Sequence, residues 1–308
     1  MPLDLTDDEL DLEGEALTQA MSQLDSNGWN LNPQTGEDEK IPHVTAMRGW
    51  MVMATLREEI LELSLGPPSK YSDERRDDLL RRCDEGYETI PKRLHYMRGT
   101  HKTKRPSCFF TQMSLCNEFL LNKLLLQRLP GGNTGSINQN IFETATTLLD
   151  RVVLIHKERD RLGNHAWEFS WYVVYFGIPS ASLLAVELLS QHQHPNRSVH
   201  PLPRSEVIQN LSMFIACLDT VRSTEGNYKL CSRVKKVICK ILDRVLESPA
   251  QSTADILVTP LPVDQTLFDV DMSSFMGPTE DPEFVRWLEN VDWTKGPLLD
   301  GFQPVTES

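Results

Sequence analysis

Long apolar runs are missing from this sequence. No stretch of 18 consecutive apolar residues occurs, and the first eleven residues are acidic, where a secretory signal needs a basic start and an apolar segment. We therefore expect an intracellular protein that makes no contact with a membrane. With 308 residues, 40% of them hydrophobic, the chain is long enough to bury a sizeable core without disulfide staples.

Closely spaced cysteines are also missing. The chain has six cysteines, and the shortest gaps are the eight residues from Cys108 to Cys116 and from Cys231 to Cys239. A binuclear zinc cluster needs two C-x-x-C pairs, so this spacing argues against one. Because the cysteines lie in apolar, helix-like stretches, we expect reduced thiols in a hydrophobic core.

Motifs of catalysis and cofactor binding are nearly lacking. The sequence has no phosphate loop with its lysine, no G-x-S-x-G, and no paired E-x-x-H or H-E-x-x-H. We predict that the glycine-rich stretch 131–136 is a connector and that His165 and Glu168 form a surface pair. His192, His194 and His200 fall in a proline-containing loop, which favours solvated side chains over a metal site. We expect no cofactor, no metal ion and no catalytic residue.

One acidic cluster deserves comparison with an enzyme motif. Asp73, Asp77 and Asp78 faintly resemble the aspartate-rich helix of enzymes that bind prenyl diphosphates. Arginines are interleaved with them, however, and no second carboxylate cluster that could complete a magnesium site is evident. The pattern favours an exposed helix face held by salt bridges. An all-α enzyme of isoprenoid metabolism is therefore the least favoured function.

Charge is distributed unevenly along the chain. Residues 1–40 hold eleven acidic residues and one lysine, a net charge of −10, and residues 249–308 hold eleven acidic and two basic residues, a net charge of −9. The total is −13, so residues 41–248 carry +6. Acidic ends beside a mildly basic body often keep a chain soluble, contact partners or fold back on the body.

The sequence lacks the alternating pattern of β-strands and instead repeats apolar residues every 3.6 positions, so we predict an all-α fold: an irregular domain of about eight helices. The predicted helices cover residues 6–24, 44–65, 72–89, 109–129, 137–162, 165–189, 205–222 and 224–247. The helix at 109–129 is apolar almost all round and should be central. The helix at 165–189 should kink or divide at Gly177 and Pro179.

The helix at 44–65 is predicted to pack through one stripe. Its apolar side chains at helical spacing are Val44, Met47, Met51 and Ala54. Trp50 and Met53 lie off this stripe, and we expect them to form a contact for self-association.

We divide the chain into three regions. Residues 1–40 form an acidic N-terminal helix and turn, residues 41–248 the helical body, and residues 249–308 an acidic, mostly irregular C-terminal tail. A short helix is predicted near 281–293 in the tail. Its candidate partner-binding residues are Phe284, Trp287, Leu288, Val291 and Trp293. The sequence leaves open whether this helix binds another protein or packs on the body.

The last body helix carries a basic stripe. Lys229, Arg233, Lys236 and Lys240 recur at helical spacing opposite apolar residues. Such a stripe suits contact with phosphates, but it lacks interleaved aromatic residues, so a solvated face or a dock for an acidic tail is the favoured interpretation. A second basic cluster, at 102–105, is of the nuclear-signal type.

Several segments, taken in order, resemble the fungal-specific regulatory domain of zinc binuclear cluster transcription factors. They are residues 2–10, 25–30, 56–61, 94–96, the helix from Phe109, residues 176–181 and residues 287–293. The later segments are similar to the carboxy-terminal half of that domain. The six-cysteine cluster that binds DNA in this family has no counterpart here, so no metal ligand is carried over.

The resemblance implies a nuclear, transcription-regulator-like helical domain that acts through protein partners and binds no specific DNA by itself. Its expected partners are a second copy, full-length relatives or the transcription machinery. A second hypothesis is a helical scaffold that pairs with full-length transcription factors and modulates them. If the family's domain is larger than this chain, an exposed apolar patch should drive self-association.

Overall fold

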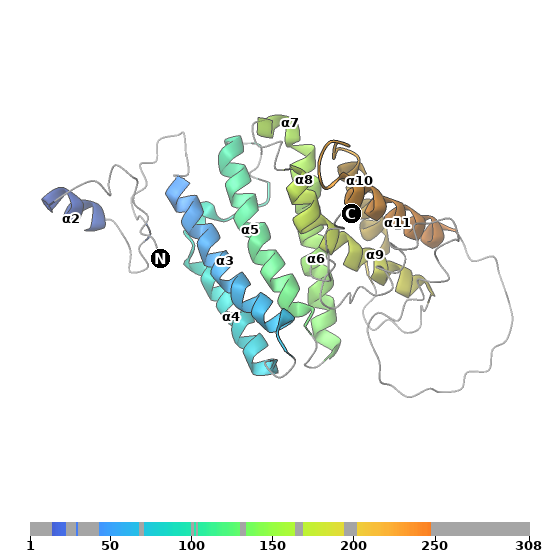
Figure 1. Cartoon of the computed structure of the whole chain (residues 1–308), viewed down its shortest axis with the longest axis horizontal. Coiled ribbons are helices and arrows are strands. Elements are labelled where there is room, and N and C mark those ends of the chain that lie inside the picture. Colours follow the sequence, from blue (N-terminus) through green and yellow to red (C-terminus); the bar gives the residue numbers. More distant parts are fainter. Residues whose placement is uncertain are drawn as a thin grey trace, which may run out of the picture. The chain divides into compact units, whose positions relative to one another are not determined.

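The computed structural model describes residues 14–22, 29, 43–67, 71–99, 102, 104–129, 134–163, 169–193 and 202–247. Every regular element within these ranges is a helix (Figure 1), so the predicted all-α fold is confirmed for the part of the chain that the structure describes. The predicted C-terminal tail lies outside the described residues.

The chain forms two compact units. Unit 1 comprises Met1–Thr134 and Leu154–Phe169, and unit 2 comprises Gly135–Val153 and Ser170–Ser308. Helix α6, Thr134–Lys157, contributes to both, because its last turn belongs to unit 1 and most of its length to unit 2. Neither unit is therefore a single stretch of sequence.

Unit 1 is built around three long helices. Its elements are α2 (Gly14–Ser22), α3 (His43–Leu65), α4 (Asp73–Thr89), the short 3-10 helix η2 (Lys92–Leu94), α5 (Pro106–Gln127) and α7 (Arg159–Leu162). Helix α3 packs against both α4 and α5, and α4 also packs against α5. Ser72 caps α4 as predicted, because its hydroxyl accepts a hydrogen bond from the amide of Arg75 at 3.2 Å.

Helix α5 is the central helix of unit 1, as its nearly uniform apolar sequence predicts. It packs closely on α3 at Gly49, where an added Cβ would lie 2.9 Å from Cδ2 of Leu115. A hydrophobic cluster around Met53 of α3 consists of Trp29, Met53, Leu56, Ile90, Leu94 and Leu115. A second cluster, farther along α3, consists of Ile60, Leu63, Leu79, Leu126 and Leu129.

The predicted packing stripe of α3 is wrong. Met47 is 45% exposed and Met51 44% exposed, whereas Met53 is 1% exposed and Leu56 6% exposed. Helix α3 has apolar residues on two faces, and α4 and α5 cover the face that contains Met53. The sequence of α3 alone does not show which of two apolar faces its neighbours cover.

Unit 2 consists of α6, α8 (Phe169–Tyr172), the π-helical turn η5 (Val173–Gly177), α9 (Ile178–Gln193), α10 (Arg204–Leu218) and α11 (Tyr228–Leu246). Helix α9 packs against α10 and α11, which also pack against each other. The predicted break at Gly177 takes the form of the π-helical turn, in which the amide of Ile178 donates to the carbonyl of Val173. Pro179 follows directly and has no amide hydrogen to donate, which favours an irregular turn just before it.

The two final helices begin and end differently from the prediction. Helix α10 ends at Leu218 rather than at residue 222, and α11 begins at Tyr228 rather than at residue 224. In the turn between them, the carboxylate of Glu225 accepts a hydrogen bond from the amide of Arg222 at 3.0 Å. This turn is therefore longer than predicted.

The run Phe169–Gln193 spans 25 residues and is long and apolar enough to cross a membrane. In the structure 78% of its most apolar window is buried inside the protein. This burial is typical of a core helix, since the apolar side chains of α9 already have partners in α10 and α11.

Candidate interaction surfaces

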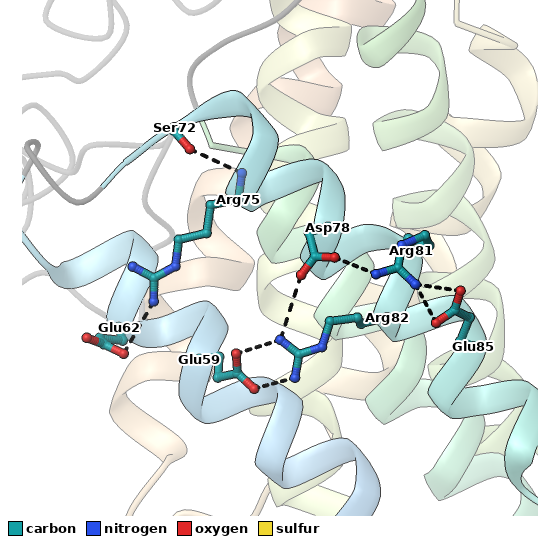
Figure 2. A network of polar contacts seen from close by, with 8 residues as sticks. All are labelled: Glu59, Glu62, Ser72, Arg75, Asp78, Arg81, Arg82 and Glu85. Atoms are coloured by element: carbon teal, nitrogen blue, oxygen red, sulfur yellow. Dashed lines mark hydrogen bonds and ion pairs between the residues drawn. The ribbon is translucent and has the colours of Figure 1, made fainter.

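The outer face of α4 is held by ion pairs (Figure 2). Arg82 donates from both terminal nitrogens to the carboxylate of Glu59 on α3, at 2.7 and 2.6 Å, and Arg81 binds Asp78 and Glu85 within α4. Figure 2 also shows Arg75 reaching Glu62 of α3 at 3.5 Å. The pairs of Arg82 with Glu59 and of Arg75 with Glu62 join α4 to α3.

The aspartates compared above with an enzyme motif take part in these ion pairs. Arg76 contacts Asp73 at 3.5 Å and Asp77 at 2.9 Å, and Asp78 binds Arg81. The hydrogen bonds from Arg82 hold the pKa of Glu59 below its usual value, while burial opposes that shift. The predicted salt-bridged helix face is therefore confirmed.

A buried polar contact links α3 to α5 in unit 1. Arg57 donates from Nε to Oδ1 of Asn122 and from a terminal nitrogen to the carboxylate of Glu118 at 3.0 Å. Asn122 in turn donates to the backbone carbonyl of Met53 at 3.0 Å. Burial raises the pKa of Glu118, and the nearby Arg57 opposes this rise. Because these groups are occupied with each other, their role is structural.

The contact between Arg57 and Asn122 was not predicted, although the sequence contains an indication of it. Arg57 lies among apolar residues of α3 and is 9% exposed, and Asn122 is fully buried in α5. A long charged residue on an apolar helix face indicates a buried partner. Only the packing of the two helices identifies which residue that partner is.

The predicted basic stripe lies on one face of α11 in unit 2. Lys229 and Lys236 are exposed, and Arg233 and Lys240 are half-buried. Arg244, which the prediction omitted, is also exposed and follows Lys240 by one turn. The opposite face is the core face, with Val234, Ile238, Ile241, Leu242 and Val245 buried.

The stripe is strongly cationic because α11 has six basic residues and only one acidic residue, Asp243. A neighbouring lysine, Lys235, forms an ion pair of 2.6 Å with Asp219, and that hydrogen bond raises the pKa of Lys235. At the other end of the helix, Arg204 donates to the backbone carbonyl of Val245. The exposed cations of the stripe are Lys229, Lys236 and Arg244.

The exposed face of α3 is a second candidate surface, and it corrects the predicted self-association contact. Met53 is 1% exposed, and Trp50 packs against the hydrophobic cluster around Met53. Met53 is therefore unavailable to a partner. The large apolar side chains that the first half of α3 does expose are Met47 and Met51.

The cysteines do not form a reactive or metal-binding group. None of the six, all of which the structure describes, forms a disulfide, and all except the half-buried Cys239 are buried. Burial raises the pKa of Cys83 to about 12 and that of Cys231 to about 11, so both stay protonated at neutral pH. Among the described residues, no group of three metal-ligating side chains gathers.

Several predicted features lie outside the described residues. These are the tail residues Phe284, Trp287, Leu288, Val291 and Trp293, the pair His165 and Glu168, and the loop histidines His194 and His200. His192 is described at the end of α9, where burial and then the charges of Arg204 and Arg244 lower its pKa.

Comparisons with known proteins yield no relative. No family model, no curated protein and no solved structure matches the chain.

Proposed function

We propose that this chain is a regulatory and interaction domain of the transcription-regulator type, which works in the nucleus through protein partners and has no DNA-binding cluster of its own. The proposal rests on the resemblance to the fungal-specific regulatory domain. It is supported by where the resembling segments fall in the two units.

The observation that carries the proposal is that these segments supply core contacts. Trp29, from the segment 25–30, is 2% exposed, and its ring lies 4.6 Å from the guanidinium carbon of Arg48. The segment 56–61 contains Arg57, which holds α3 to α5, and Ile60, which is fully buried.

Two further segments behave in the same way. His95 contacts the backbone carbonyl of Ile90 at 2.9 Å and stacks on Tyr87, with ring centroids 4.3 Å apart. The segment 176–181 is buried throughout and contains the end of the π-helical turn. A resemblance concentrated at packing positions is what a shared helical fold would produce, because core residues are the most constrained.

The proposed partner contact is the acidic tail. By sequence, Phe284, Trp287, Leu288 and Val291 fit the helix-in-groove mode of recognition, with Trp293 just beyond them. The partner would be transcription machinery with a basic-rimmed groove. The alternative function is a scaffold that pairs with full-length factors without activating transcription itself.

A reporter assay tests the proposal. The full chain is fused to an unrelated DNA-binding domain, and Trp287→Ala/Leu288→Ala is compared with Asn290→Ala/Thr294→Ala in the same tail. We expect the first pair to abolish reporter activation with the melting temperature nearly unchanged, and the second pair to have little effect.

Three other results would contradict the proposed activation. The wild-type fusion could fail to activate, or the two pairs could behave alike. A marked fall in melting temperature for Trp287→Ala/Leu288→Ala would instead place these side chains in the core. Binding to a full-length relative without activation would support the scaffold.

A further inference from the structure

Helix α3 exposes an apolar strip over its first three turns. Val44 is half-buried, Met47 and Met51 are 45% and 44% exposed, and Ala54 is exposed. These residues follow one another at three- and four-residue spacing, so they lie on one side of the helix. The next residue on this side is the exposed Glu58, where the apolar strip ends. Its length from Val44 to Ala54 is about 15 Å.

Helix α2 is a short helix that needs a partner. It has nine residues, and all its described side chains are exposed, including Met21 at 48%. A helix of this length is marginal in water without packing. In the sequence Leu17 precedes Met21 by four residues, a spacing that places two apolar positions on one helix face.

Trp29 ties α2 to the beginning of α3. Its ring is buried in the hydrophobic cluster with Met53 and Leu56, and Arg48 of α3 lies over it. Six residues, 23–28, separate Ser22, the end of α2, from Trp29. A chain of that length spans at most about 25 Å. Since the outer side of α3 is about one helix diameter, or 10 Å, away from its inner side, the strip lies within reach of α2.

We propose that α2 docks on this strip of α3 and forms an antiparallel helical hairpin with it. The antiparallel direction brings the C-terminal end of α2 closest to the second turn of α3, where Trp29 lies against Arg48. Antiparallel helices also place opposite ends of their dipoles together.

The register follows from matching the two sequences. Met21 lies opposite Met47, and seven residues farther along each helix Gly14 lies opposite Ala54. Two small residues at one crossing allow the helix backbones to approach closely. The eight residues from Met47 to Ala54 match the nine residues of α2 in length.

The short linker between α2 and Trp29 favours α2, over a second copy of the chain, as the helix that covers the strip. A short linker gives an intramolecular helix an effective concentration of roughly millimolar. A second copy at micromolar concentration competes poorly with it. The strip from Val44 to Ala54 contains no acidic residue, so it does not repel the acidic N-terminal region.

Disulfide trapping in the full-length chain tests the hairpin. The variant Met21→Cys/Met47→Cys replaces two exposed side chains, so folding is expected to be unaffected. We expect mild oxidation to give a bridge within one chain, because a disulfide requires Cα atoms about 4.4–6.8 Å apart. The matched control, Met21→Cys/Leu65→Cys, places the second cysteine 54% exposed on α3 but about 27 Å from Met47. It should form no bridge.

The outcomes of the trapping separate the possible occupants. A bridge between two chains would overturn the proposal in favour of a second copy. No bridge in Met21→Cys/Met47→Cys, or equal bridging in both variants, would overturn it as well. Single-cysteine variants report any bridge to the native cysteines, of which only Cys239 is not buried.

Hydrogen exchange gives a second measurement without cysteines. Met51→Glu puts a charge in the centre of the strip, whereas Met97→Glu puts the same charge on an exposed residue outside it. We expect amides 14–22 to exchange at least tenfold faster in Met51→Glu and at the wild-type rate in Met97→Glu. Equal exchange in all three proteins would overturn the hairpin.

Discussion

Arg57 and Asn122 form a buried hydrogen bond between α3 and α5, with Nε of the arginine donating to Oδ1 of the amide. The amide group of Asn122 also donates to the carbonyl of Met53, one turn before Arg57 on α3. Asn122 therefore satisfies a side chain and a backbone group of the same neighbouring helix. Both groups are deep in unit 1, where a lost partner is costly.

The first prediction concerns this asparagine. Asn122→Leu removes the acceptor for Arg57 and the donor for Met53, so we expect unit 1 to lose about 2–3 kcal/mol of stability. Urea unfolding followed by circular dichroism measures the loss. Asn140→Leu, at an exposed position of α6, is the control and should change stability little. Equal midpoints for the two variants would show that the buried contact contributes nothing.

The second prediction concerns the π-helical turn. A Cβ on Gly177 would lie 2.9 Å from Cζ of Phe214 and 3.3 Å from a methyl carbon of Val152. Gly177→Ala should therefore destabilise unit 2 by about 1–3 kcal/mol. Gly226→Ala is the control, because nothing lies within 4 Å of its added Cβ. Thermal unfolding of the two variants compares them, and an unchanged melting temperature for Gly177→Ala would contradict the packing described.

The third prediction concerns pH. Burial raises the pKa of Glu187, against the smaller effect of a hydrogen bond from Gln191. The ionised form is thus disfavoured in the folded state, and wild-type stability should gain as pH falls from neutral toward the unfolded-state pKa. Glu187→Gln removes this ionisation, so it should be more stable than wild type at pH 7. The difference should shrink toward pH 4.5.

Denaturant titrations at several pH values test the third prediction. Glu143→Gln, which removes an exposed carboxylate of α6, serves as the control substitution. A Glu187→Gln difference that grows as the pH falls would have the wrong sign for a buried carboxyl group.

The fourth prediction concerns DNA. We expect the chain to bind CGG-repeat and scrambled duplexes alike at about 0.15 M salt, with dissociation constants no tighter than roughly micromolar. Lys229→Glu/Lys236→Glu should weaken binding to both duplexes equally, because the stripe contacts only phosphates. Lys92→Glu/Lys102→Glu, at exposed positions of unit 1, is the control. Fluorescence anisotropy measures the binding. A nanomolar dissociation constant for CGG repeats alone would contradict the prediction that binding does not depend on sequence.

The helices themselves were predictable from sequence because their signals are local. Gly66 and Pro67 follow the apolar run and Ser72 precedes the next charged run, so the end of α3 and the start of α4 lie within a residue or two of the predicted limits 65 and 72. The ion pairs within α4 were predictable for the same reason, since they include pairs three or four residues apart, whereas the pairs to α3 were not.

The buried face of α3 was not predictable in this way. Met47 and Met53 are equally apolar, and only the positions of α4 and α5 decide that Met53 is buried. The polar core contact has the same origin, because Arg57 and Asn122 lie 65 positions apart in the sequence. The basic stripe was predicted from spacing, but its extension to Arg244 was overlooked because Asp243 interrupts the charge run.

The division of α6 between the two units has a consequence for biosynthesis. Unit 1 needs residues 154–169, which leave the ribosome only after residues 135–153 of unit 2 have emerged. Unit 1 therefore cannot finish folding before the first part of unit 2 is translated. For the same reason, no single cut in the gene yields two complete units, and a gene fusion that inherits only residues 1–134 would encode unit 1 without its closing segment.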